Sequence, residues 1–132
     1  MSEIGASRRA AGQRALGASG ERLAANWLAA RGYQIVERNW RCAYGEIDVV
    51  ADTGRELVFV EVKTRRGTAT GTPEEAVTAA KRRKLVHSTL TYIQEHGWDE
   101  RPYRIDVLAV QLTPSGRVVE IRHYPHAVGL EE

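Results

Sequence analysis

The chain has 132 residues, of which 42% are hydrophobic and 27% charged, so its length and composition fit one soluble globular domain with a single core. Its formal net charge is only +2, so a polyanionic partner would have to be recognised through local clusters of basic residues. The single cysteine excludes an intramolecular disulfide, and no apolar run reaches the roughly 18 residues that cross a bilayer, so we expect a cytoplasmic protein with no membrane partner.

The N-terminal part predicts an arm followed by a helix. Residues 1–16 are rich in Ala, Arg, Gly and Ser and have no apolar stretch of signal-peptide type, so we expect a loosely ordered arm. Residues 18–31 (ASGERLAANWLAAR) predict a helix that Ser19 caps and Gly32 ends. Its apolar stripe at helical spacing comprises Leu23, Ala24, Trp27 and Leu28.

Three extended segments follow this helix. Residues 33–40 predict a first strand, and the next two segments read GEIDVVA (45–51) and ELVFVEVK (56–63). The short Asp52-Thr-Gly54 turn between these two segments favours an antiparallel hairpin. Both segments are almost wholly apolar around their acidic residues, which is typical of strands buried on both faces.

The second half of the chain predicts a helix and two strands. After a Thr/Gly-rich loop at 64–73, Thr72 and Pro73 are suited to begin a helix that runs to about His96, with Gly97 as its stop. The buried side of that helix is expected to carry Val77, Ala80, Leu85, Tyr92 and Ile93. Strands at 104–111 and 118–124 follow, and we expect a single domain over residues 17–124 with a C-terminal tail at 125–132. This order predicts an α/β fold with a central mixed sheet flanked by helices.

The predicted hairpin contains the residues with the clearest chemical potential. Glu61 and Lys63 are two apart in a strand and project to the same face, whereas Val62 points the other way. An antiparallel neighbour can place Asp48 beside Glu61. Two adjacent carboxylates repel each other, and a hard divalent cation such as Mg²⁺ or Mn²⁺ would relieve that cost. With a lysine beside them, these residue types suit phosphodiester hydrolysis.

A structural interpretation of the same residues stays open. Charged residues that alternate with valine and phenylalanine are common on half-exposed strands, and Lys63 could pair with Glu61 only as a structural ion pair. Asp48 and Glu61, however, lie in runs that predict burial on both faces, where an unpaired carboxylate costs several kcal/mol.

Three motifs together resemble a known family. They are GxxGE (Gly17–Glu21), GEIDVV (Gly45–Val50) and VFVEVKTR (Val58–Arg65), and the resemblance extends from about Gly17 to Gln111. The pattern is similar to that of the YraN-type bacterial proteins, which belong to the PD-(D/E)XK nuclease superfamily and resemble archaeal Holliday-junction resolvases.

The resemblance implies a restriction-endonuclease-like core of helix, three strands, helix and strand. It also implies that Asp48 and Glu61 are metal ligands, that Lys63 is the catalytic lysine, and that Glu21 completes or supports the metal site. The chain departs from the nominal motif at Ile47, which replaces a proline.

Basic residues flank the Thr/Gly-rich loop on both sides and are candidates for phosphate binding. Lys81 lies four residues from both Val77 and Leu85, so it is expected on the inward side of its helix, where its ammonium could reach a phosphate or Glu61. The other predicted substrate contacts are Arg65, Arg66 and Lys84. A solvated basic face, or a lysine stem that merely covers apolar surface, is the alternative.

Several other residues are weaker candidates. Asp106 is expected to pair with Arg104 in a structural role, and the His123/His126 pair has no predicted helix or carboxylate to support a zinc site. Cys42 lacks a partner histidine and is not expected to be a nucleophile.

Two aromatic residues before the Asp48 strand could stack on exposed bases. Trp40 is better explained by core packing, and for Tyr44 the two interpretations stay open.

The hypothesis from sequence is a divalent-metal-dependent endonuclease, with DNA favoured over RNA as substrate and with branched or junction structures as candidate substrates. Asp48, Glu61 and the Val62 carbonyl would hold Mg²⁺ or Mn²⁺, with Lys63 assisting the attacking water. A homodimer is an extrapolation from the resolvases. The alternatives are a nuclease-fold module that binds nucleic acid without cutting it, and an interaction protein whose acidic cluster is an ion-pair network.

Overall fold

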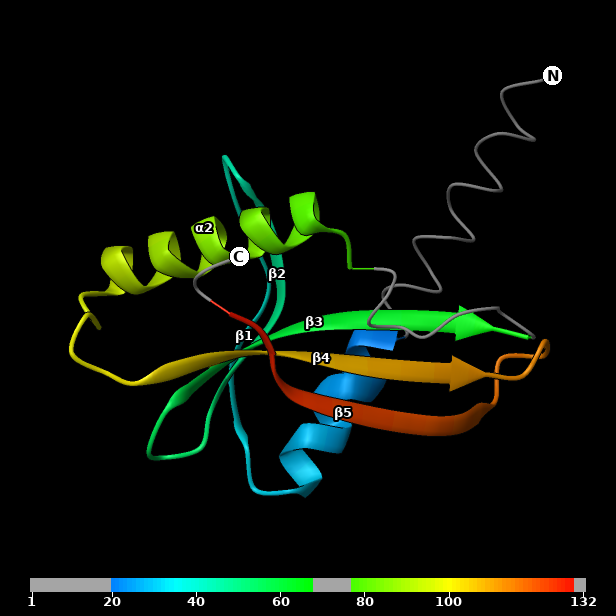
Figure 1. Ribbon diagram of the computed structural model, residues 1–132. Coiled ribbons are helices and arrows are strands. Elements are labelled where there is room, and N and C mark those ends of the chain that lie inside the picture. Colours follow the sequence, from blue (N-terminus) through cyan, green and yellow to red (C-terminus); the bar gives the residue numbers. More distant parts are fainter. Residues whose placement is uncertain (1–19, 68–76, 130–132) are drawn as a thin grey trace, which may run out of the picture.

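The computed structural model describes residues 20–67 and 77–129, which form two helices and five strands. Figure 1 shows how these elements are arranged. Residues 20–30 form the first helix. The remaining elements are β1 (Gln34–Cys42), β2 (Gly45–Asp52), β3 (Leu57–Arg66), α2 (Ala79–His96), β4 (Tyr103–Leu112) and β5 (Val118–Val128). The expected N-terminal arm lies outside the described residues, and no described helix is long and apolar enough to span a membrane.

The five strands form one mixed sheet in the order β1-β2-β3-β4-β5. Only β3 and β4 pair in parallel, and all other neighbours are antiparallel. The predicted hairpin of β2 and β3 is therefore confirmed. A parallel pair needs a crossover connection, and α2 lies in that connection.

The two helices pack on opposite faces of the sheet (Figure 1). On the α2 face, Tyr92 and Ile93 pack with Phe59 and other apolar strand residues. On the other face, Ala24 and Leu28 of the first helix cover a smaller cluster of strand residues. The predicted α/β fold with a helix-flanked mixed sheet is confirmed, and it is compatible with a restriction-endonuclease-like core.

The start of α2 differs from the sequence prediction. The helix begins at Ala79, because Thr78 adopts an extended conformation and its side chain accepts a hydrogen bond from the Lys81 backbone N–H. The predicted cap at Thr72 lies outside the described residues. Ala80 is exposed rather than buried, since the first turns of α2 border an open cleft and core packing starts at Leu85.

The C-terminal strand is longer than predicted. β5 continues to Val128, whereas the sequence predicted a strand end at Tyr124 and a tail from residue 125. His126, with a positive φ of 52°, lies where the register shifts, and beyond it Val128 is buried at 6% exposure. Residues 125–128 therefore belong to the sheet.

Candidate metal centre

The site forms where β2 separates from β3. Ladder pairing between the two strands stops at Val49 and Val60. One residue earlier, Asp48 accepts a 2.7 Å hydrogen bond at Oδ2 from the Val62 backbone N–H. The aspartate therefore satisfies a backbone donor that the departing strand leaves without a ladder partner. Its side chain is buried, with 5% exposure.

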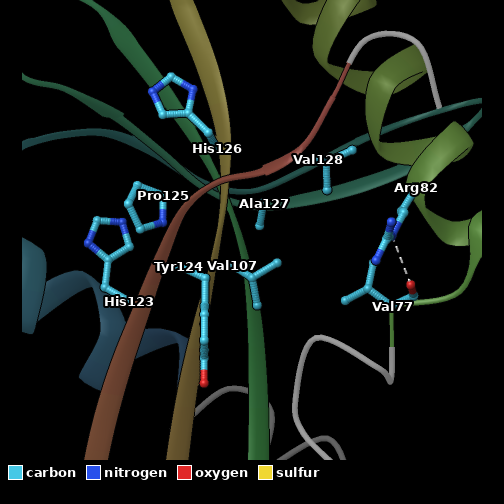
Figure 2. Close-up of a pocket in the computed structure, with 9 residues that line it drawn as sticks. All are labelled: Val77, Arg82, Val107, His123, Tyr124, Pro125, His126, Ala127 and Val128. Carbon is cyan, nitrogen blue, oxygen red and sulfur yellow. Dashed lines mark hydrogen bonds between the residues drawn. The ribbon is translucent and has the colours of Figure 1, made fainter.

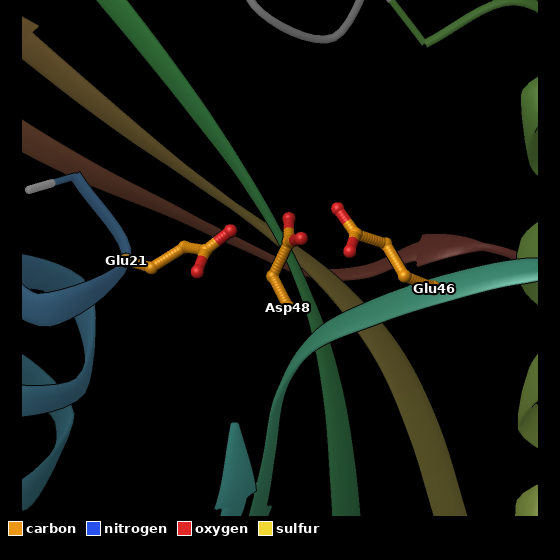
Figure 3. A group of neighbouring side chains, drawn as sticks. All are labelled: Glu21, Glu46 and Asp48. Atoms are coloured by element: carbon orange, nitrogen blue, oxygen red, sulfur yellow. The ribbon is translucent and has the colours of Figure 1, made fainter. Parts of the chain in front are cut away.

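Carboxylates from both faces of the sheet meet at Asp48. Glu21 comes from the first helix and Glu46 from the start of β2, and one ligand oxygen of each lies within 4.8 Å of the others and of Asp48. Figure 3 shows Glu21 and Glu46 approaching Asp48 from opposite sides. Glu61 also contacts the Asp48 side chain. Asp48 is thus the centre of a group of four acids.

Burial and like charges shift the ionisation of these acids. Burial, followed by the neighbouring Glu61 carboxylate, raises the pKa of Asp48 to about 8. Burial also raises the pKa of Glu61, although Lys63 and Lys81 partly oppose this. The pKa of Glu21 is raised by burial and then by Glu46. Burial and like charges therefore both favour protonation of the cluster in the absence of a cation.

Two lysines lie on the α2 side of this cluster. Lys63 Nζ is 3.3 Å from Glu61 Oε1, and both side chains are largely buried, so the predicted common face of Glu61 and Lys63 is confirmed. Contact with Lys63 lowers the pKa of Lys81, which shows that the two ammonium groups are close. The arrangement combines clustered anions with two adjacent cations.

A cleft of about 240 Å³ opens above the acids, between β2, β3 and α2. Its lining includes Asp48 and Glu61 together with Lys81 and Lys84 of α2. The other two predicted phosphate contacts lie elsewhere: Arg65 is half-buried and Arg66 is exposed near the end of β3, and neither lines this cleft.

Close helix packing brings Glu21 to the site. Gly20 is buried against β3, and a Cβ on it would lie 1.8 Å from Thr64 Oγ1 and 3.0 Å from Thr64 Cβ. Only glycine permits this approach, because the β-branched threonine cannot move its Cβ without moving the strand. The second glycine of the GxxGE motif therefore positions the glutamate that follows it.

The sequence interpretation missed Glu46. The signal was present, since Glu46 and Asp48 are two apart in a strand and share a face. Asn39 was also missed: it has a positive φ of 55°, and its side chain hydrogen-bonds Glu21. A left-handed asparagine in a strand is a conformation that sequence alone does not predict.

A second buried aspartate lies on β4. Asp106 has 0% exposure and accepts hydrogen bonds from Arg104 Nε, so the predicted structural pair is confirmed. The expectation that His123 has no nearby carboxylate is wrong, because His123 Nε2 lies 2.6 Å from Asp106 Oδ2. His126 contributes its backbone N–H to Asp106 rather than its ring.

The two histidines line a separate pocket of about 400 Å³. Figure 2 shows them along β5, across the pocket from Arg82 and Val77. Within the described ranges 20–67 and 77–129, the one group of three or more side chains that could hold a metal ion consists of Glu21, Glu46 and Asp48, and neither histidine belongs to it.

The other weaker candidates have structural contacts. Trp40 packs edge-on against Tyr92, with ring centroids 5.0 Å apart, so its predicted core role is confirmed. The Cys42 thiol donates a 3.5 Å hydrogen bond to Ser88 Oγ.

The donor chemistry at Asp48 fits a hard divalent cation. The available atoms are carboxylate oxygens, the ligands that Mg²⁺ and Mn²⁺ prefer, without sulfur or imidazole. One Asp48 oxygen is held by the Val62 amide, which fixes the orientation of the carboxylate.

Residues 20–110 match the sequence model of UPF0102, described as an uncharacterised protein family. The chain belongs to this family. A UPF0102 protein of Beutenbergia cavernae is 51% identical over 110 residues, which cover 82% of this chain and 93% of the relative. UPF0102 proteins of Symbiobacterium thermophilum and Nocardia farcinica are 50% and 48% identical, and the matches cover 80% and 81% of this chain and 89% and 84% of the relatives.

UPF0102 is the YraN-type family that the motifs resemble, so that recognition is confirmed. The family description and the names of these relatives state no activity.

Proposed function

We propose that this protein is a divalent-metal-dependent endonuclease that hydrolyses phosphodiester bonds in DNA. The observation that carries the proposal is the burial of Asp48 among three other carboxylates, with the Lys63 ammonium at one side. An acidic cluster of this kind is costly in the absence of a cation, and the adjoining cleft is lined by lysines that suit a phosphate.

Asp48, Glu61 and the Val62 carbonyl are the proposed ligands of Mg²⁺ or Mn²⁺, and Glu21 and Glu46 support the site. A cation held by these residues would supply Lewis acidity toward the phosphodiester and would lower the pKa of a water molecule toward neutrality. The Val62 N–H donates to Asp48 Oδ2 and so fixes the orientation of the carboxylate that would hold the cation. Lys63, which forms an ion pair with Glu61, would orient the attacking water or stabilise charge on the phosphate.

Positive charge around the cleft is assigned to substrate binding. Lys81 and Lys84 line the cleft and would contact the phosphates next to the scissile bond. Arg65 follows Lys63 on the same face of β3 and would contact phosphates farther away, whereas the adjacent Arg66 points to the opposite face and is not assigned to the substrate. Cutting both strands of a junction would need two such sites, which would require a homodimer.

The test is cleavage of end-labelled single-stranded, duplex, flap and four-way-junction DNA with Mg²⁺ or Mn²⁺. Wild type is compared with Asp48→Asn and Lys63→Met, which remove the central ligand and the ammonium but retain side-chain size. Glu120→Gln is the matched control, because its ion pair with Arg122 is exposed on β5, two strands from β3.

We expect metal-dependent cuts in wild type and Glu120→Gln, and a loss of at least about a hundredfold in both site variants. Absence of cutting with salt-dependent DNA binding retained would instead support a binding module. Neither cutting nor binding would support an interaction protein with a structural acidic network.

A further inference from the structure

Tyr44 is an exposed aromatic residue at the rim of the cleft. It lies in the two-residue turn between β1 and β2, and its residue exposure is 51%. The ring does not enter either core cluster but stacks on His87 of α2, with centroids 5.1 Å apart and planes inclined by 22°. Figure 1 shows the tip of this hairpin beside α2.

The turn fixes Tyr44 relative to the acidic cluster. Cys42 pairs with Gly45 across the turn, so only Ala43 and Tyr44 form the loop, which leaves little freedom to move. Gly45 and Glu46, the next two residues, line the cleft. Along the strand, Tyr44 is thus within about 7 Å of Glu46, measured between Cα atoms.

His87, the stacking partner of Tyr44, belongs to α2, which borders the cleft on the other side. His87 is flanked on α2 by Ser88 and, one turn earlier, by Lys84, and both of these line the cleft. The stack of Tyr44 on His87 joins the β1–β2 turn to α2 beside the residues that line the cleft, and that lining includes Lys81 and Lys84. An aromatic platform next to cations is the combination that holds unpaired nucleotides, since the ring stacks on the base and the ammonium groups attract the phosphates.

We infer that Tyr44, supported by His87, is a platform on which an unpaired nucleobase stacks while the adjoining phosphate occupies the acidic site. The inference rests on the proposed function and narrows its substrate class to strands with at least one nucleotide outside a duplex. A base inside a duplex has both faces covered by its neighbours and would first have to be flipped out.

The experiment measures DNA affinity by fluorescence anisotropy in Ca²⁺, with a labelled single strand of about ten nucleotides and a duplex of the same sequence. The variants are Tyr44→Ala and Tyr44→Phe, and a strand with abasic central positions serves as a third ligand. Leu90→Ala is the matched control, because Leu90 is 44% exposed on the same helix and does not line the cleft.

We expect Tyr44→Ala to weaken single-strand binding by about tenfold, because one stacked base contributes about that much to affinity. Duplex binding should change by no more than about twofold. Tyr44→Phe and Leu90→Ala should bind like wild type. The abasic strand should bind weakly and should not distinguish Tyr44→Ala from wild type.

If Tyr44→Ala lost affinity equally for the single strand and the duplex, the platform would be overturned. Failure of the wild type to bind single strands would overturn it too. The proposed chemistry is tested separately by the cleavage assay. If Tyr44→Ala weakens single-strand binding selectively but the wild type cuts no DNA, the stacking platform is supported and the nuclease is refuted. If the wild type cuts DNA but Tyr44→Ala shows no such selective loss, the nuclease is supported and the platform is refuted.

Discussion

Two buried aspartates occupy similar positions in this protein and have opposite electrostatic surroundings. Each lies in an Ile-Asp-Val sequence of a central strand, and their exposures are 5% for Asp48 and 0% for Asp106. Each accepts a hydrogen bond from a backbone N–H of the next strand. Asp48 accepts from Val62 at 2.7 Å, just beyond the end of the β2–β3 ladder. Asp106 accepts from His126 at 3.0 Å, where the β4–β5 register shifts.

The side chains around Asp48 and those around Asp106 differ in the sign of their charge. Carboxylates surround Asp48, and burial together with Glu61 raises its pKa. Burial opposes ionisation of Asp106 too, but hydrogen bonds from His123, the His126 N–H and Arg104 lower its pKa. Burial alone therefore does not mark a functional acid. The charged partners separate an acid among like charges, Asp48, from an acid whose ion pair is already satisfied, Asp106.

The largest expected effect comes from removing the charge at Asp106. Asp106→Asn leaves the Arg104 guanidinium without its buried anionic partner and should cost about 3–5 kcal/mol, which lowers the Tm by about 15 °C. Thermal unfolding followed by circular dichroism measures this loss. Glu120→Gln, which removes an exposed ion pair, should lie close to wild type. A Tm for Asp106→Asn within about 3 °C of wild type would contradict a structural role.

The pH dependence of stability should separate the two acids. Asp48 has a folded pKa of about 8 against an ordinary 3.8, so between these values the folded state binds more protons than the unfolded state. Stability without metal should therefore fall as the pH rises from about 5 to 8, by up to about 1.4 kcal/mol per pH unit.

Asp106 contributes in the opposite sense. Because its pKa is lowered, its contribution to stability is lost only as the pH falls below its ordinary value of 3.8. Urea unfolding at a series of pH values, with EDTA present, measures both trends. Stability that rises between pH 5 and 8 would show that Asp48 is not the dominant titrating group.

Removing the charge at Asp48 should stabilise the metal-free protein. Asp48→Asn keeps an oxygen for the Val62 N–H and removes the repulsion, so we expect a gain of about 2 kcal/mol at pH 8 and a flatter pH profile. The same variant should lose the thermal stabilisation that Mn²⁺ gives the wild type. Differential scanning fluorimetry with and without Mn²⁺ tests both effects. A destabilised variant that still responds to Mn²⁺ would argue against Asp48 as the central ligand.

The smallest expected effect is at Glu46, which is 42% exposed and pairs with Arg41 at 3.2 Å. Glu46→Gln should weaken Mn²⁺ binding by about threefold, because a partly exposed charge contributes less than about 1 kcal/mol. Isothermal titration calorimetry provides the affinity, with Glu120→Gln as control. A loss above about thirtyfold would rank Glu46 with Asp48 as a ligand.

Local patterns predicted the parts of the fold that local forces determine. The β-branched runs around Asp48 and Glu61 predicted the central hairpin, and the two-residue spacing correctly placed Glu61 and Lys63 on one face. The start of α2 was missed because Thr72 and Thr78 are both plausible caps in the sequence. The sequence interpretation ended the last strand at Tyr124, but β5 continues through Pro125, because proline is tolerated in an edge strand.

Tertiary geometry determined the rest of the site. The proximity of Glu21 to Asp48 depends on the Gly20–Thr64 contact and on the separation of β2 from β3. The resemblance suggested a role for Glu21, whereas Glu46 went unnoticed because an acid near a turn is ordinarily solvated. The sequence separated the two Ile-Asp-Val segments only through a near neighbour, since Arg104 predicted the structural pair with Asp106. The contacts of Asp106 with His123 and with the His126 N–H come from β5 and depend on the fold.

The parallel pairing of β3 with β4 has a consequence for biosynthesis. All the clustered acids lie between residues 21 and 61, but β4, the partner that completes the environment of β3, begins only at Tyr103. During vectorial synthesis the nascent chain exposes these acids well before a long-range parallel contact can hold β3 in place. We therefore expect metal to be captured late, after most of the polypeptide has left the ribosome.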